Sequence, residues 1–302
     1  MQDCILYDWV SITSKIHSLA DIIDLLGMRD CPWHNRDKGA RGFPFGLYYE
    51  GISIMYGRED VNVWLEMSGQ GCRAFETYGT GDYESLFDIV RDEPDGVHLT
   101  RLDVAYDDHT GLLDIDQIAK DCREQNYRSR FQDWMVTESN KGCTVEHGSP
   151  TSAIKFRIYD KAAERKRAGE HWIRIEMQLR DERAFSFISS SASIGEKFAG
   201  VLQNYLTYLS PANDSNKRRW PVAPYWEKLV NSAEPISLYI EPGTDYNMMQ
   251  MTNYVFNQAG NAIDATIDVL GIDGFLEELH ARTIRPNPKY TDLINKAKKG
   301  EL

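Results

Sequence analysis

Three segments in the middle of the chain place a tyrosine, several acids and several cations at alternate positions. The segments are Thr100–Asp107, Ile154–Lys161 and Trp172–Arg180. Because side chains on a strand alternate between faces, each segment predicts a strand with one apolar and one polar face. A purely structural sheet has no need for carboxylates, a tyrosine and cations on one face, so these residues are candidates for chemistry.

Tyr159 is the candidate nucleophile, because a tyrosine can attack a phosphodiester and keep the energy of that bond in a phosphotyrosine. Free tyrosine has a pKa of about 10 and needs nearby cations to favour its phenolate. Arg157 and Lys161 share its face of the predicted strand, and we assign them to catalysis with it. Five further polar residues on the three strands are predicted to contact DNA: Arg101, Lys155, Arg174, Gln178 and Arg180.

Two acids on the same faces, Asp103 and Glu176, are the predicted metal ligands, on strands expected to flank the tyrosine strand. Asp107 is a third, weaker candidate. Carboxylate oxygens suit Mg²⁺ or Mn²⁺ better than zinc. His147 is either an additional ligand or, as we favour, a histidine in a surface loop. No other cofactor site is predicted.

The net charge of −12 argues against a protein that simply coats DNA. Its distribution is uneven: residues 1–100 carry −9, residues 101–220 carry +1 and residues 221–302 carry −4. DNA affinity depends on local phosphate contacts, so the middle of the chain is the part that phosphate can approach. We expect specific DNA recognition to use a surface separate from the three polar strand faces.

The composition is that of a globular protein, with 42% apolar and 26% charged residues. No apolar run approaches the roughly 20 residues of a membrane span, so no membrane partner is expected. The first ten residues do not resemble a signal peptide. Five scattered cysteines without CxxC spacing indicate reduced thiols and a cytoplasmic location.

The pattern of elements predicts an α+β fold, with antiparallel sheets, helices on one face and a mostly helical C-terminal region. We divide the chain into an N-terminal half (1–99), a catalytic half (100–215) and a C-terminal region (216–302). The halves share a weak β-α-β-β-α repeat, in which Leu65-Glu-Met67 and Ile175-Glu-Met177 correspond. Either chance or duplication explains it, and a duplication would mean that the first half has lost its tyrosine strand.

Three local predictions concern single elements. One strand is expected over residues 47–56, and a tight glycine turn is expected over residues 68–72. A helical stretch is expected from about residue 183 to residue 209.

Seven short motifs in order resemble the replication initiation factors of rolling-circle plasmids, filamentous phages and integrative conjugative elements, a family that includes relaxases. They cover about residues 5–230. The motifs are Tyr7-Asp-Trp-Val-Ser-Ile12, Met67-Ser-Gly-Gln-Gly-Cys-Arg73, Thr100-Arg-Leu-Asp-Val-Ala-Tyr-Asp107, Gly148-Ser-Pro-Thr-Ser152, Arg157-Ile-Tyr-Asp-Lys161, Arg174-Ile-Glu-Met-Gln178 and Trp220-Pro-Val-Ala-Pro-Tyr-Trp226.

The resemblance implies a strand-specific nicking and closing enzyme. Tyr159 matches the family's tyrosine and would form a 5′-phosphotyrosine while releasing a 3′-OH, and Asp103 and Glu176 would match its metal-binding acids. The substrate would be origin DNA, extruded as a hairpin or single-stranded at the nick. A host helicase and a homodimer are the other partners that the resemblance implies.

Two alternatives stay open. A non-enzymatic DNA-binding regulator could keep the same fold. A metal-dependent phosphodiesterase could use water as its nucleophile in place of Tyr159.

Overall fold

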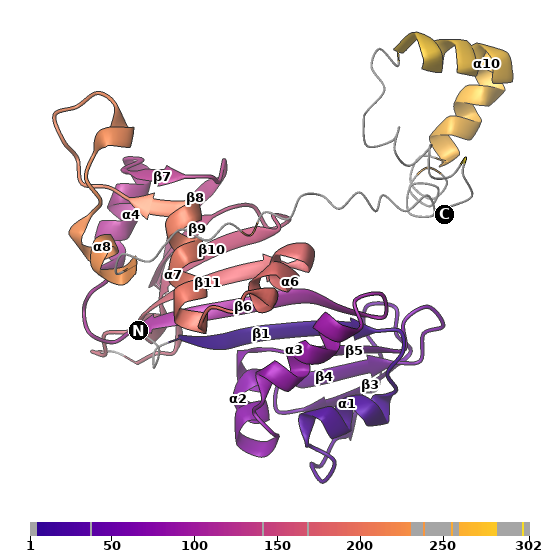
Figure 1. Ribbon diagram of the computed structural model, residues 1–302. Coiled ribbons are helices and arrows are strands. Elements are labelled where there is room, and N and C mark those ends of the chain that lie inside the picture. Colours follow the sequence, from indigo (N-terminus) through magenta and orange to yellow (C-terminus); the bar gives the residue numbers. More distant parts are fainter. Residues whose placement is uncertain are drawn as a thin grey trace. The chain divides into compact units, whose positions relative to one another are not determined.

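The computed structural model in Figure 1 describes residues 5–230 except Asp37, Lys141 and Ala168, together with Leu238, Val255, residues 260–282 and Lys298. The chain forms two compact units, residues 1–239 and 240–302. The described part of the second unit contains α10 (Gly260–Arg282), which is interrupted at Gly271, where φ is +70°. This confirms the predicted helical character of the C-terminal region. Within the described ranges, no helix has the length and apolar character needed to cross a bilayer.

A ten-stranded antiparallel sheet is the centre of the first unit, in the order β2-β3-β4-β5-β1-β6-β11-β10-β9-β8. Strands of the first half are β1 (Ile5–Ser14), β2 (His34–Asn35), β3 (Phe45–Tyr49), β4 (Ile52–Tyr56) and β5 (Val63–Met67). Strands of the second half are β6 (Val97–Asp108), β8 (Trp134–Ser139), β9 (Gly142–His147), β10 (Ile154–Asp160) and β11 (Ile173–Arg180). A separate two-stranded sheet pairs β7 (Tyr127–Ser129) with β12 (Leu206–Tyr208).

The two halves order their strands in the same way, because each first strand pairs with its half's last strand. The orders are β1-β5-β4-β3-β2 and β6-β11-β10-β9-β8, and β1 pairs with β6 to join them. The predicted boundary between residues 99 and 100 falls within β6, and the sheet continues from one half into the other. This common topology supports the internal duplication, while the predicted three-part division of the chain stays a prediction.

The strand register also shows what became of the tyrosine strand in the first half. Glu66 stands opposite Ser53, as Glu176 stands opposite Arg157. Two residues further along β4 and β10, the position of Tyr159 is taken by Met55. The expectation that this strand was lost is therefore wrong: β4 is present, but Ser53 and Met55 stand where β10 has Arg157 and Tyr159.

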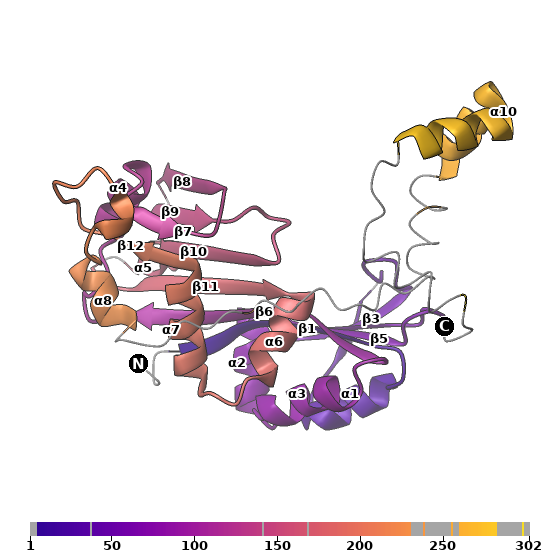
Figure 2. The same ribbon diagram turned by 45° about the horizontal axis from the view of Figure 1, so that its top comes forward.

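Helices cover one face of the sheet (Figure 2). They are α1 (Leu19–Leu26), α2 (Gly69–Tyr78), α3 (Tyr83–Asp92), α4 (Ile115–Arg123), α6 (Asp181–Ser189), α7 (Ile194–Tyr205) and α8 (Pro224–Val230), while the short α5 (Lys161–Glu164) follows β10. Their caps agree with the sequence: Ser18 and Asp21 form a capping box on α1, and Gly27 ends it in the left-handed region.

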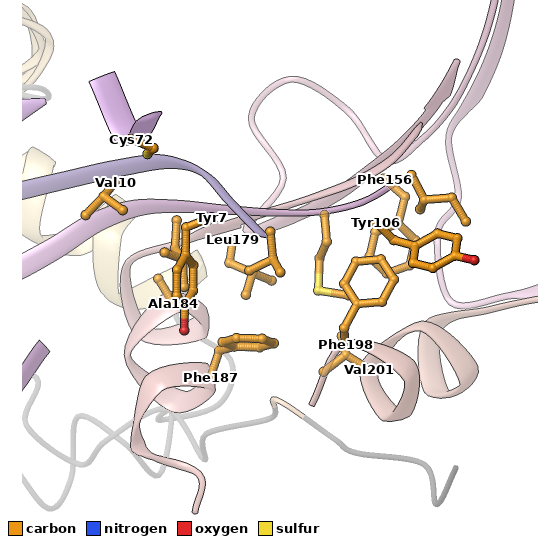
Figure 3. Close-up of a cluster of buried hydrophobic side chains, with 14 of the residues drawn as sticks. Tyr7, Val10, Cys72, Tyr106, Phe156, Leu179, Ala184, Phe187, Phe198 and Val201 are labelled. Carbon is orange, nitrogen blue, oxygen red and sulfur yellow. The ribbon is translucent and has the colours of Figure 1, made fainter. Parts of the chain in front are cut away.

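A single hydrophobic core fills the space between this face and the helices. Figure 3 shows Phe187 of α6 and Phe198 of α7 beneath Leu179 and Tyr106 of the sheet. The core contains the apolar residues of β6, β10 and β11 except Ala105, which lies opposite Glu176. Their polar neighbours must therefore lie on the opposite face, as the alternation predicted.

Three local predictions differ from the structure. The single strand predicted over residues 47–56 is the hairpin of β3 and β4, which turns at Gly51 with φ +87°. The predicted turn at residues 68–72 is the start of α2, where Ser68 is the N-cap and two glycines hide the helical pattern. The helical stretch predicted from about residue 183 to residue 209 is right for α6 and α7, but it is interrupted between them and ends in a strand, β12.

Candidate active site

The three polar strand faces lie side by side, as the sequence predicted, because β6, β11 and β10 are consecutive in the sheet. In the register, Tyr159 stands opposite Arg174 and Arg157 opposite Glu176. One detail differs from the expectation. β11 lies between β6 and β10, so the strand of Glu176 adjoins the tyrosine strand and the strand of Asp103 is one place further away.

The phenol oxygen of Tyr159 is held between an acid and a cation. It donates to Glu176 Oε2 at 3.2 Å and accepts from Lys161 Nζ at 3.2 Å. Arg157 lies over its ring, with the guanidinium carbon 5.0 Å from the ring centre. The side chain is 5% exposed. Burial, with a contribution from the charge of Glu176, raises the pKa of Tyr159 well above its ordinary value, although Arg174 acts in the opposite direction. The expected net stabilisation of the phenolate by cations is therefore absent in the free protein.

Asp103 and Glu176 are two buried carboxylates, 2% and 5% exposed. Arg101 holds Asp103 with two hydrogen bonds, and Arg157 donates to Glu176 at 3.2 Å. Burial and the nearby charge of Glu176 raise the pKa of Asp103 to about 7, against the opposing effect of Arg101. These two acids are therefore close enough to repel each other when both are ionised.

The guanidinium of Arg174 forms ion pairs with two acids. It donates to both oxygens of Asp107 at 2.7 Å, and it also lies 2.8 Å from Asp8 Oδ2. Trp172 Nε1 adds a hydrogen bond to Asp107 Oδ1 at 2.7 Å. Arg174 is only 4% exposed, so it is placed to orient its neighbours and not to reach DNA from the surface.

Two acids of this network were absent from the predicted site. Asp8 lies at a β-bulge of β1, which breaks the alternation that would have placed it. Glu146 on β9 is 2.8 Å from Lys155 and 3.3 Å from Arg157. The sequence feature that could have indicated Glu146 is its position on β9, the strand that directly precedes the tyrosine strand in the chain.

The remaining predicted DNA contacts lie on the same face. Lys155 is 8% exposed and paired with Glu146. Gln178, in the amide orientation that suits its neighbours, accepts from Arg180 at 2.7 Å. Lys161 also pairs with Glu164 of α5. Most cations of this face are thus already neutralised by acids.

His147 is not in a surface loop. It lies on β9 with no exposed surface, and its Nε2 is 2.9 Å from the hydroxyl of Tyr208. Burial lowers its pKa to about 4, so the ring is neutral. It contacts the aromatic rings of Tyr127 and Phe131 on the helix-covered side, away from Glu176.

A metal ion has a restricted choice of donors here. Among the described residues, no group of three or more His, Cys, Asp or Glu side chains is arranged to hold one. Both oxygens of Asp107 are occupied by Arg174 and Trp172. The mutual repulsion of Asp103 and Glu176 is what a divalent cation would relieve, so these two hard oxygen donors fit Mg²⁺ or Mn²⁺. The four described cysteines are free and offer no soft alternative near them.

Comparison with known proteins identifies the family. A family model described as "Replication initiation factor" matches residues 97–279, and one described as "Rolling Circle replication initiation protein N-terminal domain" matches residues 4–92. The chain belongs to the rolling-circle replication initiation factors. Initiators and relaxases of this family nick origin DNA and generally use divalent metal ions.

Two relatives of this initiator chain cover most of its length. A putative DNA relaxase, NicK, of Bacillus subtilis is 24% identical over 261 residues, which are 79% of this chain and 74% of the relative. The solved structure of a rolling-circle replication initiator protein from Geobacillus stearothermophilus is 30% identical, with a TM-score of 0.70. It covers 78% of this chain and 98% of that one, so the fold is shared as well as the sequence.

Proposed function

We propose that this initiator nicks and rejoins one strand of its origin with Tyr159 as the nucleophile, to start rolling-circle replication or transfer of a plasmid, phage or conjugative element. The observation that supports this most directly is the pair of 3.2 Å contacts of the Tyr159 hydroxyl, one with Glu176 and one with Lys161. A nucleophile needs an acceptor for its proton and a cation for its developing charge, and this oxygen has both.

In the forward step the Tyr159 oxygen bonds to the scissile phosphorus and the bond to the 3′-oxygen breaks. The phenol proton passes to Glu176 Oε2, its hydrogen-bond acceptor. Lys161 Nζ, which donates to the phenol oxygen, stabilises the negative charge on that oxygen. The 3′-oxygen leaves with the electrons of its bond to phosphorus and takes a proton from water. The products are a 5′-phosphotyrosine and a 3′-OH that primes synthesis, and the reverse transfer closes the strand.

Asp103 and Glu176 would hold the metal ion. When bound, Mg²⁺ or Mn²⁺ would neutralise charge on the scissile phosphate and stabilise the extra charge of the transition state. Arg101 keeps the Asp103 carboxylate in place through two hydrogen bonds. Arg157, which stands opposite Glu176 on β10, holds the Glu176 carboxylate with one hydrogen bond.

The DNA at the nick would be a hairpin or a single strand, which the family resemblance implies. Of the predicted DNA contacts, Arg101 and Arg180 are only part-buried, so they are the ones that phosphate can reach with least rearrangement. A host helicase and a second copy of the chain are the further partners proposed for the steps after nicking.

The test incubates the protein with Mn²⁺ and supercoiled DNA that carries its own origin. We expect nicked circles with protein attached to the 5′ end, and no adduct with Tyr159→Phe. Tyr106→Phe is the matched control, because Tyr106 is a buried tyrosine on β6 that points into the core.

Other outcomes would favour one of the two alternative functions or indicate a folding defect. Normal nicking by Tyr159→Phe without an adduct would favour water as the nucleophile. DNA binding without any nicking by the wild-type protein would favour a regulator. Loss of the adduct in both variants would indicate damage to the fold.

A further inference from the structure

We propose that this initiator holds the duplex DNA beside the nick on a second surface, the β7 patch, formed by Arg128, Arg130 and Arg218 with the neighbouring Lys217 and Arg219. This inference rests on the proposed function, because it places the DNA that flanks the nicking site. Arg128 lies on β7, Arg130 just after it, and Arg218 on the short 3₁₀ helix Lys217–Arg219, which packs against β7.

The patch is basic in an acidic chain. Residues 127–130 and 203–220 carry five Lys or Arg and one Asp, a net charge of +4, whereas the whole chain carries −12. The one acid, Asp214, is 3.5 Å from Arg219. Local positive charge of this kind is what phosphate binding requires, whatever the total charge.

The loop that brings Arg218 to β7 is fixed in place. Lys217 Nζ donates to the backbone carbonyls of Glu124 and Gln125, both at 3.0 Å, just before β7 begins. Trp220 Nε1 donates to the carbonyl of Asp214 at 2.7 Å and closes the loop on itself. Figure 1 shows this orange loop beside β7 and α4. The cations are therefore held together by the fold and do not lie on a trailing segment.

The patch differs from the catalytic face in how its cations are paired. On the catalytic face Arg101, Lys155, Arg157, Lys161 and Arg174 all form ion pairs. Within the described part of the chain, Arg128, Arg130 and Arg218 form no ion pair, and all three are exposed. Phosphate bound at the patch would displace only water and counterions, whereas phosphate on the catalytic face must compete with carboxylates. The patch can therefore bind phosphate without breaking an ion pair, whereas the paired cations of the catalytic face cannot.

The chemistry of the patch favours a duplex over a single strand. Sequence-tolerant binding of single strands uses exposed aromatic rings on which bases stack. Here Tyr205 is covered by Arg130, whose guanidinium carbon is 5.5 Å from the ring centre, and Tyr208 is buried. A cleft of about 400 Å³ beside these arginines is lined by polar groups including Ser129, Gln203 and Asn204. Arginines with small polar side chains are the usual contacts to the backbone of duplex DNA.

The patch is separate from the nicking site. The ring of Tyr127 on β7 lies 4.9 Å from His147, and Phe131 lies 5.2 Å from Phe156. Both contacts are on the helix-covered side of the sheet, whereas Tyr159 is on the open side. A single strand at Tyr159 and a duplex at the patch can thus be bound at the same time.

The test measures binding to a fluorescent duplex of arbitrary sequence and to one of its single strands, in a Tyr159→Phe background that cannot form an adduct. The variant is Arg128→Ala/Arg130→Ala/Arg218→Ala. The matched control, Lys15→Ala/Arg36→Ala/Lys38→Ala, removes the same charge from exposed positions of the first half that form no ion pair among the described residues. We expect the patch variant to lose at least tenfold in duplex affinity, and its slope of log affinity against log salt to fall by about 3. The control and the single strand should change much less.

A further variant with lysine at the three positions should recover most of the duplex affinity, which a mere folding defect would not allow. An unchanged salt slope in the alanine variant would overturn the inference. So would an equal loss in the control, which would mean that only total charge matters, or an equal loss on the single strand. Because no cleavage is measured, these results stand whether or not Tyr159 proves to be the nucleophile.

Discussion

The carboxylate of Asp8 on β1 lies 2.8 Å from the guanidinium of Arg174 on β11. This ion pair, between a buried arginine and a partly buried acid, connects the first half of the chain to the strand beside the nucleophile. Arg174 stands directly opposite Tyr159 and lowers the pKa of its phenol, against the larger effect of burial. The first half, which has no tyrosine at the equivalent position, thus helps to orient the site of the second half.

We expect Asp8→Asn to slow nicking by about tenfold, because about 1.4 kcal/mol of transition-state stabilisation is lost when Arg174 is less well oriented. DNA affinity should not change. Glu66→Gln, on the equivalent polar face of the first half, is the control. Single-turnover nicking rates and binding curves distinguish the two effects, and a loss of affinity alone would contradict the orienting role.

Removing Arg174 itself should destabilise the fold. Arg174→Met leaves Asp107 and Asp8 without their buried cation, and breaking such a pair costs about 3 kcal/mol or more. Urea unfolding monitored by tryptophan fluorescence would measure it. Arg29→Ala, which breaks an exposed pair with Asp24, should leave the free energy of unfolding nearly unchanged, because exposed ion pairs are screened by solvent.

Asp103 predicts a specific pH dependence of stability. Its pKa is about 7 in the folded protein and 3.8 ordinarily, so the folded state binds the proton more tightly than the unfolded state. The free energy of unfolding should therefore fall as the pH rises from about 4 to about 7 and then level off. Asp103→Asn should remove this slope when unfolding is measured with EDTA present. Parallel curves for the two proteins would show that Asp103 titrates normally.

The same two carboxylates should govern metal affinity. We expect Asp103→Ala and Glu176→Ala each to weaken Mn²⁺ binding by at least tenfold, measured by calorimetry without DNA. Glu66→Ala is the control, since Glu66 holds the equivalent strand position in the first half and pairs with Arg41. Unchanged affinity in both site variants would exclude these residues as the ligands.

A substitution at Gly51 would test the packing of the β3–β4 hairpin, which was not predicted from the sequence. A Cβ there would lie 2.5 Å from the backbone nitrogen of Gly71, and φ is +87°. Gly51→Ala should destabilise the fold by more than the roughly 1 kcal/mol of backbone strain alone. Gly111→Ala, at φ +81° with no atom within 4 Å, should show only that strain. Equal effects in thermal unfolding would mean that the contact relaxes freely.

Alternation along the strands was enough to predict which side chains share the polar face. It gave Tyr159, Arg157 and Glu176 together, because period two is fixed by the backbone. It could not give the order of the strands, which depends on pairing between distant segments. Nor could it place Asp8, because a bulge shifts the register there.

The glycines explain the other errors. Gly69 and Gly71 begin α2 although their helix propensity is low, because a Cβ at Gly69 would meet the Asp8 carboxylate and one at Gly71 would meet the backbone of Gly51. The burial of His147 was missed because it depends on a contact with Tyr208, which is distant in sequence. The pairing of β7 with β12 was missed for the same reason, since it brings Tyr127 against Tyr208. No local pattern carries that information.

The hydrogen-bonded pairing of β1 with β6 extends from Ile5 opposite Tyr106 to Ser14 opposite Val97. The two halves therefore cannot move apart unless this strand pairing is broken. The sheet acts as a rigid plate that carries the nucleophile and both acids on neighbouring strands. No hinge within residues 5–230 has to close for these groups to meet. The movement needed between cutting and rejoining therefore belongs to the DNA, which must bend, melt or exchange strands over a fixed protein surface.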